Sequence, residues 1–81
     1  MAKREDLQDW VIAALKANGG SASIVQVAEH IWTHQEKELR ASGELFFTWQ
    51  YDMRWACNRL RERKTVQAAE VSKRGEWRLA A

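Results

Sequence analysis

Glycine occurs at only three places in this chain, and these places divide it into four segments. Gly19 and Gly20 follow a first stretch of helical periodicity, Gly43 separates the second stretch from the third, and Gly75 lies near the end. Glycine adopts, without steric cost, the left-handed backbone conformation that ends a helix or closes a tight turn. No proline interrupts the segments between these glycines. The pattern predicts three helices followed by a small β-hairpin.

The first two segments carry apolar side chains at helical spacing. We expect a first helix over about 5–17, with acidic residues at the positive end of its dipole. Its apolar stripe is Leu7, Trp10, Val11, Ala14 and Leu15. A short extended piece, 21–23, leads into a second helix over about 24–39, where Ser23 and Gln26 have the spacing of a capping box. The stripe of this second helix is Ile24, Val27, Ala28, Ile31, Trp32, Gln35 and Leu39.

The third segment predicts a helix over about 48–64, after a loop over 40–46 that contains the helix breaker Ser42-Gly43. Because a helix turns about 100° per residue, one side of this helix is apolar and the other is largely polar. The apolar side is Trp49, Met53, Ala56, Cys57 and Leu60. The opposite side is Tyr51, Arg54, Trp55, Asn58, Arg61 and Glu62. A helix that presents arginines, an amide and aromatic rings to solvent is suited to contact a partner.

The last segment predicts a β-hairpin, with strands over 66–71 and 76–79. A three-residue loop with Gly75 in the left-handed conformation joins the strands, and the tip of this loop is Lys73 and Arg74. In the resulting register, Val71 lies opposite Trp77 and Ala69 lies opposite Leu79. This register gathers four apolar side chains on one face, which favours it over the alternatives. A mainly α fold, with three helices and then a basic hairpin, is the winged-helix architecture.

Positive charge is concentrated in the second half of the chain. The residues through Leu39 include four basic and six acidic side chains, a net charge of −2, whereas those from Arg40 onward include nine basic and five acidic side chains, a net charge of +4. The densest basic stretch runs from Arg54 to Lys64. Such an asymmetry favours a polyanionic partner, although a basic helix is equally compatible with a solvated surface.

The size and composition predict one globular domain, 1–81, without catalytic activity. A domain of this size buries only about 60% of its unfolded surface, which leaves little room for a substrate pocket. No segment has the length and hydrophobicity of a membrane span or a signal peptide. The single cysteine, Cys57, excludes an internal disulfide, so we expect a cytoplasmic protein.

Two short motifs resemble the N-terminal winged-helix domain of Mrr-type restriction endonucleases. They are Trp55-Ala56-x-x-x-Leu60 in the third helix and Arg74-Gly75-Glu76-Trp77-Arg78-Leu79 at the end of the chain. The layout is also similar to the winged-helix modules that read methylated adenine in some restriction enzymes. One departure is Lys64, which stands where the Mrr group commonly has a glycine after the third helix. No nuclease domain follows in these residues, so the resemblance implies a DNA-reading domain that acts with a separate nuclease or regulatory protein.

A winged helix of this kind places its third helix in the major groove of duplex DNA and its wing on the neighbouring backbone. Arg54 and Arg61 would then reach guanine O6 and N7, and Asn58 would pair with adenine. Residues at the start of the helix and at the wing tip would contact the DNA backbone or the bases. The complete set of expected DNA-binding residues is Thr48, Gln50, Tyr51, Arg54, Trp55, Asn58, Arg61, Lys73 and Arg74.

The two aromatic residues in this set have alternative roles. Tyr51 and Trp55 could stack on a flipped base or form a cage around a modified one, which would make binding sensitive to base modification. The simpler interpretation is that Trp55 packs under the first helix or the hairpin as part of the core, and the family resemblance favours this interpretation. The tryptophans at 10, 32, 49 and 77 have the spacing of packing residues.

Metal binding and nucleophilic catalysis find little support in the sequence. His30 and His34 have a spacing that can hold a metal on one helix face, but no third ligand lies near them in the sequence, whereas a structural zinc site takes four. Cys57 has no orienting histidine, and no glycine-rich phosphate loop is present. We therefore expect no metal, no cofactor and no enzymatic activity.

A second class of function remains open. Winged helices also serve as protein–protein interaction modules, for adaptor contacts or dimerisation, without binding DNA. The exposed aromatic pair on a helix that is only partly basic favours this alternative. A homodimer through the first helix or through Trp32 is compatible with either function and would present two half-sites to DNA.

Overall fold

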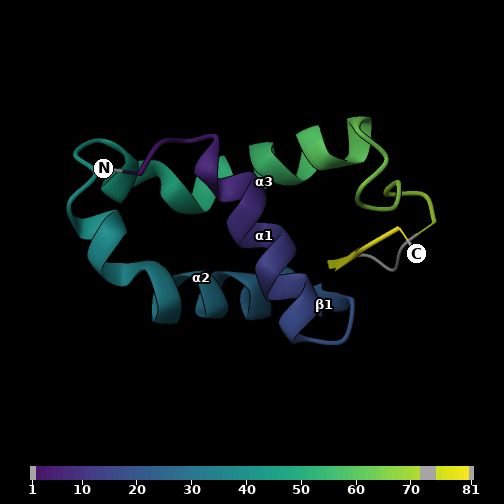
Figure 1. Ribbon diagram of the computed structural model, residues 1–81. Coiled ribbons are helices and arrows are strands. Elements are labelled where there is room, and N and C mark those ends of the chain that lie inside the picture. The colour runs from purple at the N-terminus through teal and green to yellow at the C-terminus, as the bar shows by residue number, and fades with distance from the viewer. Residues whose placement is uncertain (1, 72–74, 81) are drawn as a thin grey trace.

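Three helices and a two-stranded antiparallel sheet make up the fold in a computed structural model that describes residues 2–71 and 75–80. Helix α1 crosses between the other two helices and contacts both of them (Figure 1). The expected mainly α fold with a small β element is confirmed. No helix in these described ranges is long and apolar enough to cross a bilayer. In chain order the elements are α1 (Asp6–Ala17), β1 (Ser21–Ser23), α2 (Ile24–Arg40), α3 (Leu45–Glu62) and β2 (Glu76–Arg78).

The core forms where the apolar stripes of the helices meet, as their spacing predicts. Helix α1 buries four residues of its stripe, and Trp10 packs at the edge of the core. Val66 and Trp77 join the core from the C-terminal segment, and Ala22 joins it from β1. The buried helical residues are Leu7, Val11, Ala14, Leu15, Val27, Ile31, Leu39, Leu45, Trp49, Met53, Ala56, Cys57 and Leu60.

The capping box at the start of α2 is present as predicted. The backbone N–H of Gln26 donates to the Ser23 hydroxyl over 3.1 Å, and the Ser23 N–H donates to Oε1 of Gln26 over 2.9 Å. Before it, the Gly20 N–H donates to the Leu15 carbonyl, which closes the end of α1. These local bonds satisfy backbone groups that a helix terminus leaves unpaired. They also fix the direction in which the chain enters α2.

The prediction that α3 begins near Thr48 is wrong, because the helix begins one turn earlier at Leu45. The Leu45 side chain is buried, and it lies on the same side of the helix as Trp49 four residues later. Burial of this extra leucine favours helical backbone where the sequence alone indicated a loop. The connection between α2 and α3 therefore shortens to residues 41–44, in which Gly43 has φ +61°.

The predicted hairpin register is also wrong. Trp77 pairs with Ala22 of β1, and Leu79 forms a bridge with Val66, so neither lies opposite the residue expected from the hairpin. Val71 and Ala69 are exposed, and residues 69–71 form a turn instead of a strand. The physical reason is burial of Val66, which lies in the core opposite Leu79, so that the Gln67 N–H donates to the Arg78 carbonyl while β1 pairs with the other edge of β2. Gly75 has the left-handed φ of +77° that the prediction assigned to it.

Lys64 follows α3 in the left-handed conformation, with φ +65°. This is the position at which the Mrr group commonly has glycine, so the turn has the backbone conformation suited to that residue although lysine occupies it. A residue with a Cβ atom pays roughly 1–2 kcal/mol for this conformation. The turn is held by its surroundings, because the N–H groups of Thr65 and Val66 both donate to the Leu60 carbonyl.

Replacing Lys64 with glycine is expected to stabilise the domain. The strain that is relieved exceeds the extra conformational entropy of glycine in the unfolded chain, which leaves a gain of about 0.5–1 kcal/mol. Urea denaturation of Lys64→Gly beside Lys64→Ala measures this gain, because the alanine variant loses the same side chain but keeps the Cβ atom. A glycine variant less stable than the alanine variant would contradict the strain assigned to this turn.

Candidate nucleic-acid interface

Four of the expected DNA-binding residues lie along one stripe of α3. Gln50, Arg54, Asn58 and Arg61 follow one another at intervals of four, four and three residues, which places them on one side of a helix. The stripe adjoins the buried face of α3 on one flank. The carboxylate of α3 nearest to this stripe is that of Glu62, which follows Asn58 by four residues and is paired with Arg59 over 3.0 Å. The stripe therefore presents positive charge and amide groups to a partner from Gln50 to Asn58, and an acid follows at its C-terminal end.

The two arginines of the stripe are held differently. Arg54 is exposed and makes no ion pair or side-chain hydrogen bond to another described residue. Arg61 is half-buried, and its Nε donates to the Gln67 carbonyl over 3.1 Å. This bond uses one donor of the Arg61 guanidinium and leaves its terminal nitrogens available. The Arg54 side chain is therefore more available to a partner than that of Arg61. The bond from Arg61 also holds α3 against the segment that follows it.

A shallow hollow of about 230 Å³ connects the polar stripe to the sheet. Its α3 wall includes Arg54, Asn58 and Arg61, and its other walls include Ile24 at the start of α2 and Trp77 of β2. Residues from three separate parts of the chain thus meet along the stripe. The hollow is too small and open to enclose an ordinary substrate, which typically needs a cleft of about 300–1,000 Å³. Its position suits it to border an extended contact surface.

Thr48 and Trp55 lie on the flank of α3 beyond Tyr51, each about one turn from Tyr51 along the helix, so they are farther around the helix from Gln50 and Arg61 than the other expected contacts. The Thr48 hydroxyl lies 2.8 Å from Oδ2 of Asp52 and 3.4 Å from the Glu44 carbonyl. A carboxylate beside this hydroxyl disfavours an approaching phosphate. Thr48 is therefore poorly placed for a DNA backbone contact, and its side chain instead bonds within the first turns of the helix.

Trp55 is half-buried and packs against the core. The guanidinium carbon of Arg4 lies 3.9 Å from the centre of its ring, and that of Arg59 lies 5.8 Å from it. These are cation–π distances. A base could stack on this ring face only by displacing Arg4. The structure therefore favours the packing role for Trp55 over the aromatic cage proposed with Tyr51.

Two large aromatic side chains remain in solvent on the outer surface of α3. The Phe47 side chain is 83% exposed and the Tyr51 side chain is 79% exposed. The prediction included Tyr51 but missed Phe47, because it placed Phe47 before the start of the helix. The spacing of Leu45, Trp49 and Met53 at four-residue intervals was the signal that could have found the earlier helical turn.

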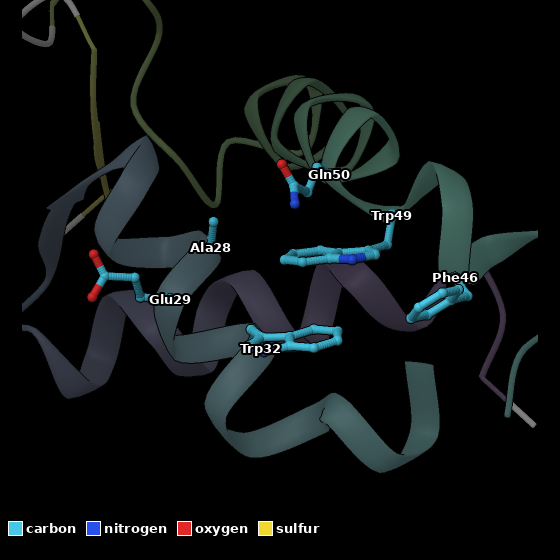
Figure 2. A pocket seen from close by; sticks show the side chains of 6 residues that line it. All are labelled: Ala28, Glu29, Trp32, Phe46, Trp49 and Gln50. Atoms are coloured by element: carbon cyan, nitrogen blue, oxygen red, sulfur yellow. The ribbon is translucent and has the colours of Figure 1, made fainter. Parts of the chain in front are cut away.

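An aromatic hollow of about 440 Å³ lies between α2 and the start of α3 (Figure 2). The Trp32 and Trp49 rings in it are nearly parallel, with centroids 6.0 Å apart, and Phe46 lies 6.4 Å from Trp32. Arg40 lies over both Trp32 and Phe46 and also forms an ion pair with Glu36. The complete lining is Ala28, Glu29, Trp32, Phe46, Trp49 and Gln50. Gln50 is therefore shared between this hollow and the polar stripe.

The residues considered for metal binding or catalysis do not form a site. The His30 and His34 rings lie 4.2 Å apart, and partial burial, with a smaller contribution from His34, lowers the pKa of His30. Across residues 2–71 and 75–80, no three histidine, cysteine or acidic side chains gather closely enough to hold a metal ion. Burial raises the pKa of the Cys57 thiol to about 11, although Arg61 opposes this shift. The thiolate needed for nucleophilic attack is thus strongly disfavoured at neutral pH.

The expected basic tip of the hairpin, Lys73 and Arg74, lies outside the described residues. Gly75 lies beside the start of α2, since the Ile24 N–H donates to the Gly75 carbonyl over 3.1 Å. Comparison with known protein families, with curated proteins and with solved structures found no match to this chain. The resemblance to Mrr-type domains therefore stays a prediction.

Proposed function

We propose that this chain binds duplex DNA as a winged-helix module, with α3 in the major groove and the C-terminal wing on the adjacent backbone. The observation that carries this proposal is the polar stripe of α3, where Arg54, Asn58 and Gln50 are exposed and the neighbouring carboxylate of Glu62 is paired with Arg59. Phosphate contacts by arginine and lysine supply most of the affinity for DNA, so an exposed arginine on this stripe favours binding. The concentration of positive charge after Arg40 agrees with this role.

The connection between α2 and α3 supports the same proposal. A helix-turn-helix motif joins its two helices by a turn of about three or four residues that often contains glycine. Here residues 41–44 form the turn, and Gly43 supplies the left-handed backbone conformation. The second helix of such a motif lies in the major groove and contacts base edges with its N-terminal residues. In this chain that helix is α3, which carries the polar stripe.

The positions along the stripe suggest how bases are read. Arg54 donates two hydrogen bonds to guanine O6 and N7, and Asn58 pairs with adenine N6 and N7. Arg61 contributes through its terminal nitrogens, because its Nε is engaged by Gln67. Lys73 and Arg74 at the wing bind phosphate. Arg54 and Asn58 thus supply most of the sequence preference, and the wing supplies affinity.

The resemblance to Mrr-type domains extends the proposal to a biological setting. It implies a DNA-reading domain of a restriction-modification system, without catalytic activity of its own, that works with a separate nuclease or regulatory protein. Binding would then be sensitive to base modification, with methylated adenine as the modification to test first. Because Arg4 covers the Trp55 ring, sensitivity of this kind is expected to arise on the stripe and at Tyr51.

Titration of a labelled duplex is expected to give salt-dependent binding. If about five or six phosphates are neutralised, log Kd should change with log salt with a slope near 5, so that a fourfold rise in salt weakens binding about a thousandfold. Fluorescence anisotropy at several salt concentrations, with plain and adenine-methylated duplexes of the same sequence, measures both the slope and any preference. Absence of binding at low salt would contradict the proposal.

A protein partner is the second candidate function, favoured specifically by Phe47 and Tyr51. Large aromatic side chains are enriched at the centres of protein interfaces. This candidate predicts self-association or partner binding with little salt dependence and no affinity for duplex DNA. Sedimentation of the purified chain beside the anisotropy titration separates the two candidates. Dimer formation together with DNA binding would support a DNA-binding dimer with two half-sites.

A further inference from the structure

Phe47 and Tyr51 form an apolar ridge on the outer surface of α3. The two residues are four apart, so their side chains are neighbours on the helix. Arg54 and Asn58 continue the same surface toward the C-terminal end of the helix, about one and two turns beyond Tyr51. The ridge therefore occupies the first turns of α3, while hydrogen-bonding side chains occupy the following turns. Within the helix, no carboxylate lies between the ridge and Arg54 on this surface.

The Phe47 ring is supported by a chain of aromatic contacts that reaches the core. Its centroid lies 5.0 Å from that of Phe46 in an edge-to-face arrangement, and Phe46 lies 6.4 Å from Trp32. Trp32 stacks on Trp49, which is 95% buried. Edge-to-face and offset-stacked pairs are favourable aromatic arrangements. Phe47 is thus positioned by its neighbours although most of its surface is in solvent, and a side chain held in place loses less entropy when it binds.

We propose that the Phe47–Tyr51 ridge contacts the C5-methyl groups of thymine in the major groove, which makes the domain prefer A·T-containing sites at the base pairs that face the first turns of α3. This inference rests on the proposed function and adds a specificity to it. The C5-methyl of thymine is the apolar feature that an unmodified base pair presents in the major groove, and phenylalanine is among the side chains that contact it.

The charge on the C-terminal side of the ridge favours this occupant over an apolar protein surface. A thymine methyl lies in a groove bordered by phosphates, so a cationic group beside the side chain that reaches it favours the contact. Arg54 lies beside the ridge on its C-terminal side and the exposed amide of Gln50 is next to it on the helix, whereas the carboxylate of Glu44 lies one turn before Phe47 and that of Asp52 is bonded by the Thr48 hydroxyl. The position of Phe47 in the first turn also agrees, because N-terminal residues of a recognition helix reach base edges.

Replacing thymine with uracil removes the methyl group and changes no hydrogen-bonding group or charge. Duplexes of alternating dA–dT and of alternating dA–dU provide this comparison without knowledge of the target sequence, since every register presents the same groups to α3. Burying one methyl is worth about 0.8 kcal/mol, which corresponds to about a fourfold change in Kd. We expect the wild-type chain to bind dA–dT at least fourfold more tightly than dA–dU in competition anisotropy.

Two variants identify the origin of such a preference. Phe47→Ala should bind both duplexes with nearly equal Kd, because the contact to the methyl group is lost while the charges remain. Arg54→Ala should weaken binding to both duplexes by the same factor and preserve the ratio of their Kd values, because neither duplex contains guanine and Arg54 contributes only its positive charge to each. Phe47 is exposed, so its removal leaves the core intact, and far-UV circular dichroism checks that the variant is folded.

The outcomes distinguish this inference from the proposed function. Equal binding of dA–dT and dA–dU by the wild-type chain overturns the methyl contact and leaves DNA binding in place. A preference that persists in Phe47→Ala also overturns it, because the methyl group would then act through the shape of the duplex. If a folded chain binds neither duplex, both proposals are overturned. The ridge would then be assigned to contact with a protein partner.

Discussion

Replacing Arg54 with alanine should weaken DNA binding by about fivefold to a hundredfold. A bidentate contact to guanine contributes about 1–3 kcal/mol of discrimination, and each 1.4 kcal/mol changes Kd tenfold. Arg54 is exposed and has no ion pair or side-chain hydrogen bond to any described residue, so its removal should not alter the fold. Anisotropy titration of wild-type and Arg54→Ala chains on a preferred duplex measures the loss, and thermal denaturation should give the same Tm for both.

Arg63→Ala is a matched control for this experiment. It removes the same charge one residue after α3, but Arg63 is directed toward α1, where its Nη1 donates to Gln8 over 3.0 Å. An equal loss of affinity in both variants would mean that net charge, and not the stripe, determines binding. Adding Arg61→Ala to Arg54→Ala should weaken binding further and also lower the Tm, because the bond to Gln67 is lost. Undiminished affinity of this double variant would refute α3 as the recognition helix.

Replacing Leu60 with alanine should cost about 2–5 kcal/mol of stability. Leu60 is fully buried where α3 meets the rest of the core, and truncation there removes buried surface and leaves a cavity. A domain of 81 residues has a free energy of unfolding of roughly 4–12 kcal/mol, so this loss is a large share of the whole. Urea denaturation followed by tryptophan fluorescence measures it as a fall in the midpoint concentration.

Phe47→Ala is the matched surface variant for Leu60→Ala. Its side chain is larger than leucine but mostly in solvent, so its removal should change the free energy of unfolding by less than about 0.5 kcal/mol. The contrast tests whether α3 has its apolar side inward as the structure shows. Similar midpoints for the two variants would mean that the buried and exposed sides of α3 are wrongly assigned.

The helices follow closely from the sequence because their determinants are local. The stripe of α1 and the capping box of Ser23 and Gln26 depend on residues within one or two turns, and both are present in the structure. The apolar side of α3 is likewise set by spacing alone. The start of α3 is less local, since helical backbone before Thr48 depends on burial of Leu45 against the other helices.

The sheet could not be predicted by the same means. A hairpin explains the alternation of apolar residues near the end of the chain, but β2 pairs with β1, a segment whose three residues carry little pattern of their own. On the other side, Leu79 meets Val66, three residues before its predicted partner Ala69. The choice depends on where α1 ends and α2 begins, since these two helices place Ser21–Ser23 beside β2. Pairing between segments far apart in the sequence depends on how the helices pack, so the periodicity of apolar residues within one segment cannot predict it.

The arrangement of side chains on α3 was predicted in part. Spacing placed Arg54, Asn58 and Arg61 opposite the apolar residues, because helical geometry fixes that relation, but it also placed Trp55 there, which packs partly buried against the core. It could not show that Arg61 donates to Gln67, or that Arg4 covers Trp55, since both contacts join residues from different segments. The exposure of Phe47 was missed because its role depends on the position of the first helical turn.

The pairing of β1 with β2 has a consequence for how this chain folds during synthesis. Ser21–Ser23 leave the ribosome well before Glu76–Arg78, and at about 5–20 residues per second the delay is roughly three to ten seconds. Throughout that interval the nascent chain lacks Trp77, which lies opposite Ala22 in the finished sheet. The helices can associate earlier, but the edge of β1 stays open to other chains until the final strand arrives. The sheet therefore forms last, after the helices that place its two strands side by side.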